Sequence, residues 1–534
     1  MTHPSPVRPG DLRDVTVVLH VRDQADTLPA CLDSLFGQTL GAERIEVVAV
    51  DDGSADGGGS LLARAEQERP GLLRAARFHR GASTAEARNW AMGQATGRYL
   101  LFLTGADRLA PRALELMVAS ADDNEADVVL GRLESSGSHP VATSMFRRSQ
   151  GSVDLYGSRV YWSLTPEKLF RTSMVRRCGL EFPLDAPFGE DQVFTAAAYV
   201  RADSVAVVAD EPCVVKGPPA AGAASPAQRI ALAGRMVGLL NSMLPAGPRR
   251  DLLVSRHLET DLGEATGRTL LATERPADRE HALWAAAELL RGAVPGSALA
   301  LLPRPLAVRY ALIAAGHHAE AERMAAYEAD TSRPAPKKTV ENGRVYTLLP
   351  YFRDPSVGLP DELFDITDRM TVNQQLTGAR WNGSLLLLDG HAFFEQLSTR
   401  ERATKVVLRH RPTGAEERFS VTARRDETLV NSKGKTRAMG RFSARINLRQ
   451  MSDGRPLAPG VWDVHLSVSF EGVTREVRLG RRRSEDVDVV SRAPVVFAPS
   501  PTTPGHELAA TPFYTPEGDL SLEIAERLPV PSGR

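Results

Sequence analysis

Short apolar runs alternate with segments of helical periodicity over the first 220 residues. Residues 15–19 (VTVVL) and 45–50 (IEVVAV) are rich in β-branched side chains and predict buried strands. Between them, over 28–36, apolar side chains recur at helical spacing. Strands that alternate with helices at short spacing predict a parallel sheet of Rossmann-like α/β type.

Acidic turns follow two of the predicted strands. Asp52 lies in a DDGS turn after the second strand, and Asp107 ends a TGAD turn after the apolar run 99–103. Pro111 predicts the first turn of the next helix. Such acids and glycines are ordinary turn formers. Open α/β sheets also bind ligands at the carboxyl ends of their strands, so both turns are candidate ligand sites.

The pattern changes after Gly217. Prolines and alanines over 218–226 predict a flexible joint, and the segments that follow are rich in Ala, Leu and Arg at helical spacing. Amphipathic helices are expected near residues 230–243, 252–272, 281–291 and 306–326. The sequence RPAP at 333–336 predicts the end of this helical linker.

From residue 337 onward the hydrophobic period is two. The clearest strand is 462–470 (WDVHLSVSF). A Glu-Gly turn at 471–472 and a partner strand at 474–479 follow it. Further strands are expected at 385–388, 405–409 and 441–448. This pattern predicts an immunoglobulin-like β-sandwich. The proline-rich segment 498–534 is expected to be a tail that is only loosely attached to the sandwich.

Composition sets few limits on function. The chain has 534 residues, 42% hydrophobic and 25% charged, and a net charge of −1, so no global field marks a nucleic-acid binder. Its three cysteines, Cys31, Cys178 and Cys213, are too few for a disulfide framework or metal cluster. Residues 1–9 lack the apolar core of a signal peptide, and no run approaches the roughly 18 apolar residues of a membrane span. We therefore expect a cytoplasmic protein without a transmembrane segment, either free or peripheral at the inner face of the membrane.

The ordered motifs of residues 14–217 resemble the family 2 glycosyltransferases of GT-A fold. Each motif alone is only weakly specific for this family, but the occurrence of all of them in this order is highly specific. The motifs are DDGS at 51–54, ARN at 87–89, GRYLLFL at 97–103, WSLTPEKLFR at 162–171 and GEDQVF at 189–194.

The remaining sequence resembles one group within that family, the wall teichoic acid (polyribitol-phosphate) β-N-acetylglucosaminyltransferases. The matching residues are RPL at 304–306, VWDV at 461–464 and REVRLG at 475–480. The resemblance implies a sandwich that binds the acceptor and forms an oligomer, commonly a homotrimer. The domains implied are a GT-A (nucleotide-diphospho-sugar transferase) domain at 1–220, a helical linker at 221–336, the β-sandwich at 337–497 and the tail at 498–534.

The resemblance identifies Asp191 as the catalytic base. An inverting transfer needs one base, which takes the proton from the acceptor hydroxyl while its oxygen attacks the anomeric carbon. Asp191 stands in the GEDQVF motif where the family has that base. The residues alone leave an alternative open, because Glu190 and Asp191 also suit the N-terminus of a helix over 192–199 through capping and dipole.

The same resemblance implies a nucleotide-sugar site across the strand ends. Asp52 matches an acid that hydrogen-bonds uracil, and Arg88 matches an arginine of the donor pocket, with a planar fork suited to base or phosphate oxygens. Asp23 stands where the family usually has Asn, and Glu190 is assigned to the same site. Lys216 either neutralises a phosphate or is an ordinary solvated lysine.

The resemblance also implies a metal site, but this sequence departs from the metal-binding motif of the family. The leaving diphosphate is normally stabilised by Mg²⁺ or Mn²⁺ held through Asp-x-Asp. Here Thr104 and Ala106 replace two expected acids, and Asp107 remains as the candidate metal ligand. Either Asp107 binds the metal together with diphosphate and water, or basic residues replace the metal, or the domain has lost turnover.

Local charge favours an anionic acceptor. Residues 401–450 contain thirteen Lys or Arg against five Asp or Glu, and Arg481, Arg482 and Arg483 follow. Such a surplus is either a solvated face or a surface for a polymer with regularly spaced phosphates. Few aromatic side chains accompany it for base stacking, so a polyol phosphate fits better than nucleic acid.

The leading hypothesis is transfer of a sugar, N-acetylglucosamine from UDP-GlcNAc, to a teichoic-acid-like polymer. Two further hypotheses belong to other functional classes. The substitutions at Thr104 and Ala106 leave open a catalytically impaired protein that binds glycopolymer or serves as a scaffold. The sandwich by itself is a candidate carbohydrate-binding or oligomerisation module.

Overall fold

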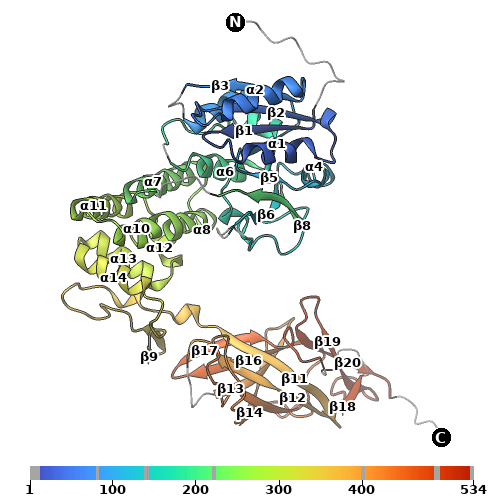
Figure 1. Ribbon diagram of the computed structural model, residues 1–534. Coiled ribbons are helices and arrows are strands. Elements are labelled where there is room, and N and C mark those ends of the chain that lie inside the picture. The colour runs from blue at the N-terminus through green and yellow to red at the C-terminus, as the bar shows by residue number, and fades with distance from the viewer. Residues whose placement is uncertain are drawn as a thin grey trace. The chain divides into compact units, whose positions relative to one another are not determined.

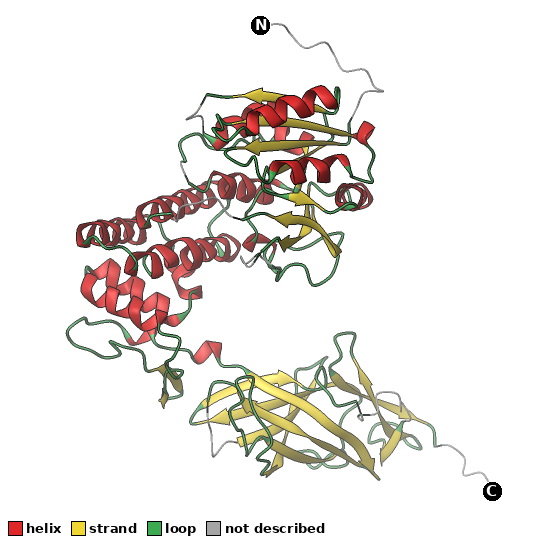
Figure 2. Cartoon of the chain, in the orientation of Figure 1, coloured by secondary structure: helices red, strands yellow, loops and turns green. Residues whose placement is uncertain are grey.

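The computed structural model describes residues 13–79, 83–137, 141, 143–186, 188–218, 224–397, 403–485, 487 and 494–529. The chain divides into two compact units, Met1–Ser332 and Arg333–Arg534 (Figure 1). Most of the helices belong to the first unit, and the second is built almost entirely of strands (Figure 2).

The first unit is built on an eight-stranded mixed sheet in the order β3-β2-β1-β4-β7-β6-β8-β5. Its first four strands are parallel, and β7 runs antiparallel between β4 and β6. This confirms the predicted GT-A type α/β fold. The strands are β1 (Val15–Val21), β2 (Ile45–Asp51), β3 (Leu73–Arg77), β4 (Tyr99–Thr104), β5 (Arg108–Leu109), β6 (Val128–Ser135), β7 (Leu169–Arg171) and β8 (Val205–Lys216).

Helices cover this sheet because its central strands are apolar on both faces. Every residue of β1 and β2 is buried. Alternate β1 residues from Val15 to Val21 share one core with Cys31, Leu35 and Met117. The helix expected from Pro111 begins two residues later, at Ala113. The covering helices are α1 (Leu28–Phe36), α2 (Gly58–Glu68), α3 (Thr84–Gly93), α4 (Ala113–Asp123), α5 (Thr172–Arg177) and α6 (Glu190–Arg201).

The helical segment belongs to the same compact unit as the sheet. Residues 219–223 of the predicted joint lie outside the described part of the chain. The segment expected as one helix over 252–272 is interrupted by a π-helical turn at Leu258–Leu262. The helices are α7 (Pro226–Met243), α8 (Pro248–His257), α9 (Gly263–Ala265), α10 (Arg268–Leu271), α11 (Pro276–Gly292), α12 (Gly296–Leu301), α13 (Arg304–Ala315) and α14 (His318–Ala329).

The single helix predicted over 306–326 is wrong. It is two helices, α13 and α14, because Gly316 ends α13 in the left-handed conformation with φ 84°. Among the described residues, none of the helices has the length and apolar character needed to cross a membrane.

The second unit is an antiparallel β-structure around one core, which confirms the predicted sandwich. The first half of β14 pairs with β13 and its second half with β15, so this strand joins the two sides. Leu386, Ile446, Val464 and Leu522 from both sides share the core. The strands are β9 (Lys338–Glu341), β10 (Arg344–Thr347), β11 (Val372–Asn382), β12 (Leu385–Phe394), β13 (Ala403–His410), β14 (Glu416–Arg424), β15 (Arg441–Asn447), β16 (Gly460–Phe470), β17 (Val473–Arg478), β18 (Val495–Pro499), β19 (Glu507–Tyr514) and β20 (Leu520–Arg527).

The prediction of a loosely attached tail at 498–534 is wrong for its described part, which ends at residue 529. Strand β20 pairs with β16 and with β19, and Leu508, Leu522 and Ile524 are buried in the core. Prolines hid this pattern from sequence reasoning. Pro512, for example, lies in the part of β19 beyond its pairing with β18, where the missing N–H costs less.

Candidate functional site

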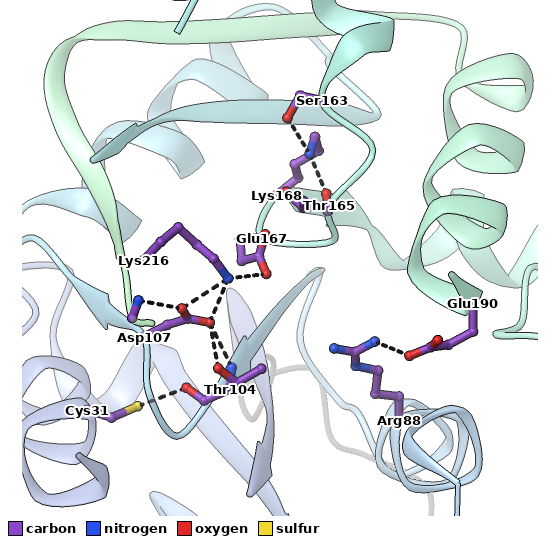
Figure 3. A network of polar contacts seen from close by, with 11 residues as sticks. Cys31, Arg88, Thr104, Asp107, Ser163, Thr165, Glu167, Lys168, Glu190 and Lys216 are labelled. Carbon is purple, nitrogen blue, oxygen red and sulfur yellow. Dashed lines mark hydrogen bonds and ion pairs between the residues drawn. The ribbon is translucent and has the colours of Figure 1, made fainter. Parts of the chain in front are cut away.

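The turn after β4 carries a buried and fully occupied carboxylate, Asp107. Its Oδ2 accepts hydrogen bonds from the Thr104 N–H (3.1 Å) and hydroxyl (2.9 Å), and its Oδ1 accepts one from the Gly217 N–H (3.1 Å). The Lys216 ammonium lies 3.0 Å from Oδ1 and 3.1 Å from Oδ2 (Figure 3). A carboxylate offers about four lone-pair directions, and all of them are used here.

Lys216 at the end of β8 lies between two acids. Its Nζ also contacts Glu167 Oε1 at 2.6 Å, and its side chain is 21% exposed (Figure 3). Burial lowers the pKa of Lys216, but Glu167 and Asp107 outweigh that effect and raise it. For Glu167, burial raises the pKa and the neighbouring Lys216 lowers it below the usual value. At neutral pH Lys216 is therefore an ammonium and Glu167 an ionised carboxylate.

Lys168 adds a second, buried amine beside this cluster. Its Nζ donates to the Ser163 hydroxyl at 3.1 Å and to the Thr165 carbonyl. Burial lowers its pKa to about 8. Lys168 therefore stabilises the loop that carries Glu167.

Asp191 and Glu190 occupy the first turn of α6, directly after Gly189. Gly189 has φ 78°, and a Cβ there would lie 2.6 Å from Leu232 of α7, so this position requires glycine. Burial, reinforced by the adjacent Glu190, raises the pKa of Asp191 to about 6. A carboxylate with this pKa is ionised at neutral pH and can still accept a proton.

Arg88 of α3 lies close to this helix N-terminus. Its Nη1 is 3.3 Å from Glu190 Oε1 (Figure 3). Its guanidinium lies 5.1 Å from the centre of the Phe182 ring. The Arg88 side chain is buried. Glu190 therefore forms an ion pair with Arg88. The assignment of Glu190 to the donor site from the sequence did not identify this partner.

One pocket of about 540 Å³ collects most of the predicted site residues. Arg88, Asp107, Asp191 and Lys216 line it together, although they come from four different segments. Asp23, Asp52 and Glu190 do not line it.

Asp52 and Asp23 instead connect the turn after β1 to the turn after β2. Asp52 is fully buried, with Oδ2 3.1 Å from Arg22 Nη1 and 3.5 Å from His20 Nε2. Asp23 has φ 49° and accepts a hydrogen bond from the Ala55 N–H at 2.7 Å. Both contacts fix the geometry of the two turns beside the pocket.

The pocket also contains residues to which sequence reasoning gave no role. Glu167 and Trp162 line it, and both lie in the WSLTPEKLFR motif that was recognised only as a family marker. Arg256 reaches it from α8, where its Nη1 contacts Gln192 Oε1 and Asp261 Oδ2, each at 3.0 Å. The sequence signal for Arg256 was a charged residue in a segment of helical periodicity. The residues that Arg256 contacts could not be predicted from the sequence.

Two family models match the chain. The one described as "Glycosyl transferase family 2" matches residues 15–180, and the one described as "TarS beta-glycosyltransferase C-terminal domain 1" matches residues 365–524. The first match contains every strand of the eight-stranded sheet except β8, together with Arg88, Asp107 and Glu167. Residues 15–180 are therefore similar to the family 2 glycosyltransferases.

Two relatives of the chain are named for polyribitol phosphate. It is 25% identical over 487 residues to the poly(ribitol-phosphate) beta-glucosyltransferase of Bacillus spizizenii, covering 88% of this chain and 72% of the relative. It is 29% identical over 198 residues to the poly(ribitol-phosphate) beta-N-acetylglucosaminyltransferase TarS of Staphylococcus aureus, covering 37% of this chain and only 34% of the relative.

Solved structures of S. aureus TarS share the fold of this chain. The crystal structure of TarS has a TM-score of 0.58 at 19% identity and covers 96% of this chain and 85% of that one. An N-terminal fragment of TarS in complex with UDP-GlcNAc has a TM-score of 0.56 at 20% identity, covering 65% of this chain and 98% of that one.

The residues around Asp107 do not fit a divalent metal ion. Mg²⁺ and Mn²⁺ require carboxylate oxygens with free lone pairs, whereas both oxygens of Asp107 are occupied and one partner is itself a cation. In the described part of the chain, no three His, Cys, Asp or Glu side chains form a group that could hold a metal ion.

Proposed function

We propose that the chain is an inverting glycosyltransferase that moves a sugar from a UDP-sugar to an anionic polyol-phosphate polymer of the teichoic acid type. One observation carries this proposal: Asp191, Arg88 and Lys216 line a single pocket at the strand ends of a family 2 domain. The names of the relatives support polyribitol phosphate as the acceptor and either glucose or N-acetylglucosamine as the sugar.

In this proposal Asp191 is the base. Its carboxylate takes the proton of an acceptor hydroxyl while that oxygen attacks the anomeric carbon opposite the diphosphate. The raised pKa of about 6 makes Asp191 a stronger base than an ordinary aspartate, while it remains ionised at neutral pH. Arg88, which is held by Glu190, is positioned to bind the nucleotide. We assign N-acetylglucosamine as the sugar because the sequence resemblance favours it.

The decisive experiment measures UDP release from UDP-GlcNAc and from UDP-glucose with polyribitol phosphate as acceptor. We expect Asp191→Asn to lower kcat by about 10² to 10⁴, with little change in UDP affinity, because only the proton acceptor is lost. Asp203→Asn is the matched control, since its side chain is 90% exposed just beyond the other end of α6. Undiminished turnover in Asp191→Asn would rule out its role as the base.

The alternative, a glycopolymer-binding or scaffold protein without turnover, is motivated by the residues Thr104 and Ala106. The same assay distinguishes it. A wild-type chain that binds polymer but releases no UDP from either donor would support the alternative, and steady turnover would exclude it.

For the second unit we propose that the Arg481–Arg483 triplet contacts the acceptor phosphates. At least five arginines of the basic run, including Arg409, Arg418 and Arg441, pair with carboxylates, which reduces the charge expected there. In contrast, Arg481 and Arg483 donate hydrogen bonds to backbone carbonyls. All three arginines line a pocket of about 830 Å³ together with His391 and Gln374.

Replacing Arg481, Arg482 and Arg483 by Gln tests this assignment. We expect the KM for long polymer to rise by about tenfold, and the dependence of binding on salt to weaken, because phosphate contacts are lost. Arg425→Gln is the control, since Arg425 is exposed and paired with Glu427. An unchanged KM and salt dependence would show that the triplet does not bind the acceptor.

Two further expectations from the resemblance stay proposals. We propose a homotrimer formed through the C-terminal unit, which light scattering on the full chain would measure. We also propose a cytoplasmic protein that associates with the inner face of the membrane, which flotation of the full chain with anionic vesicles would test.

A further inference from the structure

Three cations line the donor pocket among the described residues: Arg88, Lys216 and Arg256. Arg88 is held by Glu190, and Arg256 by Gln192 and Asp261. Each guanidinium therefore has a fixed partner on or beside a helix. Lys216 differs because it lies where the ends of β4 and β8 meet, between Asp107 and Glu167 (Figure 3).

The backbone around Lys216 requires small residues. A Cβ on Gly217 would lie 2.2 Å from the carbonyl oxygen of Ala106, so a side chain at 217 would separate the two strand ends. With glycine there, the Gly217 N–H reaches Asp107 Oδ1 at 3.1 Å. This close approach brings the Lys216 ammonium onto the turn after β4.

Thr104 complements this arrangement electrostatically. It donates two hydrogen bonds to Asp107, whereas an acid at the same position would place a second negative charge beside that carboxylate. When the neighbouring Lys168 is counted with the cluster, the two lysines balance Asp107 and Glu167 in formal charge. These four residues consequently have no excess negative charge to attract a divalent cation, and Asp107 holds the Lys216 ammonium in place.

Lys216 retains the capacity to bind an anion. An ammonium has three N–H donors, and its two carboxylate partners leave one for a ligand in the pocket. A preorganised cation next to developing negative charge stabilises a transition state without reorganisation.

We propose that the Lys216 ammonium replaces a divalent metal ion as the cation that binds the donor diphosphate, and that transfer proceeds without metal. The proposal rests on the proposed transferase function. The acceptor oxygen forms a bond to the anomeric carbon, and its proton goes to Asp191. The bond from that carbon to the β-phosphate oxygen breaks, and the electron pair stays on the oxygen of UDP, which accepts a hydrogen bond from Lys216. Lys216 keeps its proton throughout.

Calorimetry with UDP and UMP on the full chain tests the proposal in EDTA and in Mn²⁺. We expect wild type to bind UDP in EDTA with a Kd within about threefold of that in Mn²⁺. Lys216→Met should weaken UDP binding in EDTA by about tenfold or more but change UMP binding by less than about twofold, since UMP lacks the β-phosphate. A purely structural role of Lys216 would weaken both nucleotides alike and would contradict the proposal.

A second variant guards against unfolding. Lys216→Met leaves two buried acids unpaired, so Lys216→Met combined with Asp107→Asn and Glu167→Gln removes all three charges and keeps the side-chain shapes. Both variants should show the same selective loss of UDP affinity, with thermal unfolding as the check on folding. Wild-type UDP binding that requires Mn²⁺ would overturn this inference and leave the transferase function standing. Wild type that binds UDP in neither condition would overturn both.

Discussion

Asp191 shows how one side chain can have both a structural and a catalytic reading. At the first turn of α6 an acid is favoured by the helix dipole, which accounts for its position without any chemistry. The dipole, however, favours the ionised form, whereas burial and Glu190 raise the pKa of this group to about 6. Burial and Glu190 therefore oppose the effect of the helix dipole on the ionisation of Asp191.

The raised pKa predicts the pH dependence of catalysis. A base must be deprotonated to accept the acceptor proton, so kcat/KM should be constant above pH 7 and fall on the acid side of about pH 6. Below that pH the rate should drop by about tenfold per pH unit. Steady-state rates from pH 5 to pH 8 measure this profile, and a profile that is flat down to pH 5 would contradict the assignment.

The site could be predicted where its residues lie at the end of a strand, in the turn after it or in the first half of a helix. Arg88, Asp107, Asp191 and Lys216 lie in such places, and they converge on one pocket. Glu167 and Arg256 could not be assigned, because Lys216 and Gln192, which connect them to the pocket, are about fifty or more residues away in the sequence. Nor could the saturation of Asp107 be foreseen, since it depends on Lys216 and on Gly217, more than a hundred residues further along the chain.

At the scale of elements, the junction of α8 with the π-helical turn is a buried polar cluster. His257 Nδ1 lies 2.8 Å from Asp261 Oδ2, and its Nε2 lies 3.0 Å from the Tyr161 hydroxyl. Arg256 extends from the same turn into the donor pocket. The turn thus connects the helical segment to the wall of the candidate pocket, in keeping with the frequent occurrence of π-turns at functional sites.

Burial lowers the pKa of His257 to about 4, which predicts a loss of stability in acid. The unfolded chain binds a proton near pH 6.5 and the folded chain does not, so stability is complete above pH 6.5 and falls as the pH decreases toward 4. Between pH 7 and pH 5 this one group should cost about 2 kcal/mol of unfolding free energy.

Urea unfolding at pH 7 and pH 5 measures this cost. His257→Gln should flatten the difference between the two pH values relative to wild type, because the titrating group is removed while a polar side chain remains. An equal drop in the variant and in wild type would assign the acid sensitivity to other groups.

The elements themselves were predictable wherever a regular hydrophobic period lay between clear turn residues. Strand β16 and its partner β17 were found within two residues of their ends. The break at Gly316 was missed because the apolar residues of α13 and α14 continue the same helical period across it. In each case local periodicity sets the type of element, and tertiary packing sets where it ends.

At the scale of the whole molecule, the second unit depends on its last strands. Leu508, Leu520, Leu522 and Ile524 are buried in its core. At about 1.5–3 kcal/mol for each buried side chain, they contribute an amount comparable to the total stability of a domain.

A chain that ends at residue 497 should therefore lose the fold of its second unit. Calorimetry should show the unfolding transition of that unit in a chain that ends at residue 529 and its absence in the shorter chain. Retention of this transition after removal of residues 498–534 would contradict the pairing of β20 with β16.

Arg256 has a consequence for the evolution and engineering of such enzymes. Because a helix of the linker supplies part of the proposed donor pocket, the proposed catalytic module extends beyond residue 220, to the end of the first compact unit at Ser332. Recombination at residue 220 would combine the sheet of one enzyme with the helices of another, so the two parts of the pocket would come from different proteins. Exchange near residue 332 would transfer the pocket intact, so hybrid enzymes with altered acceptors are best joined there.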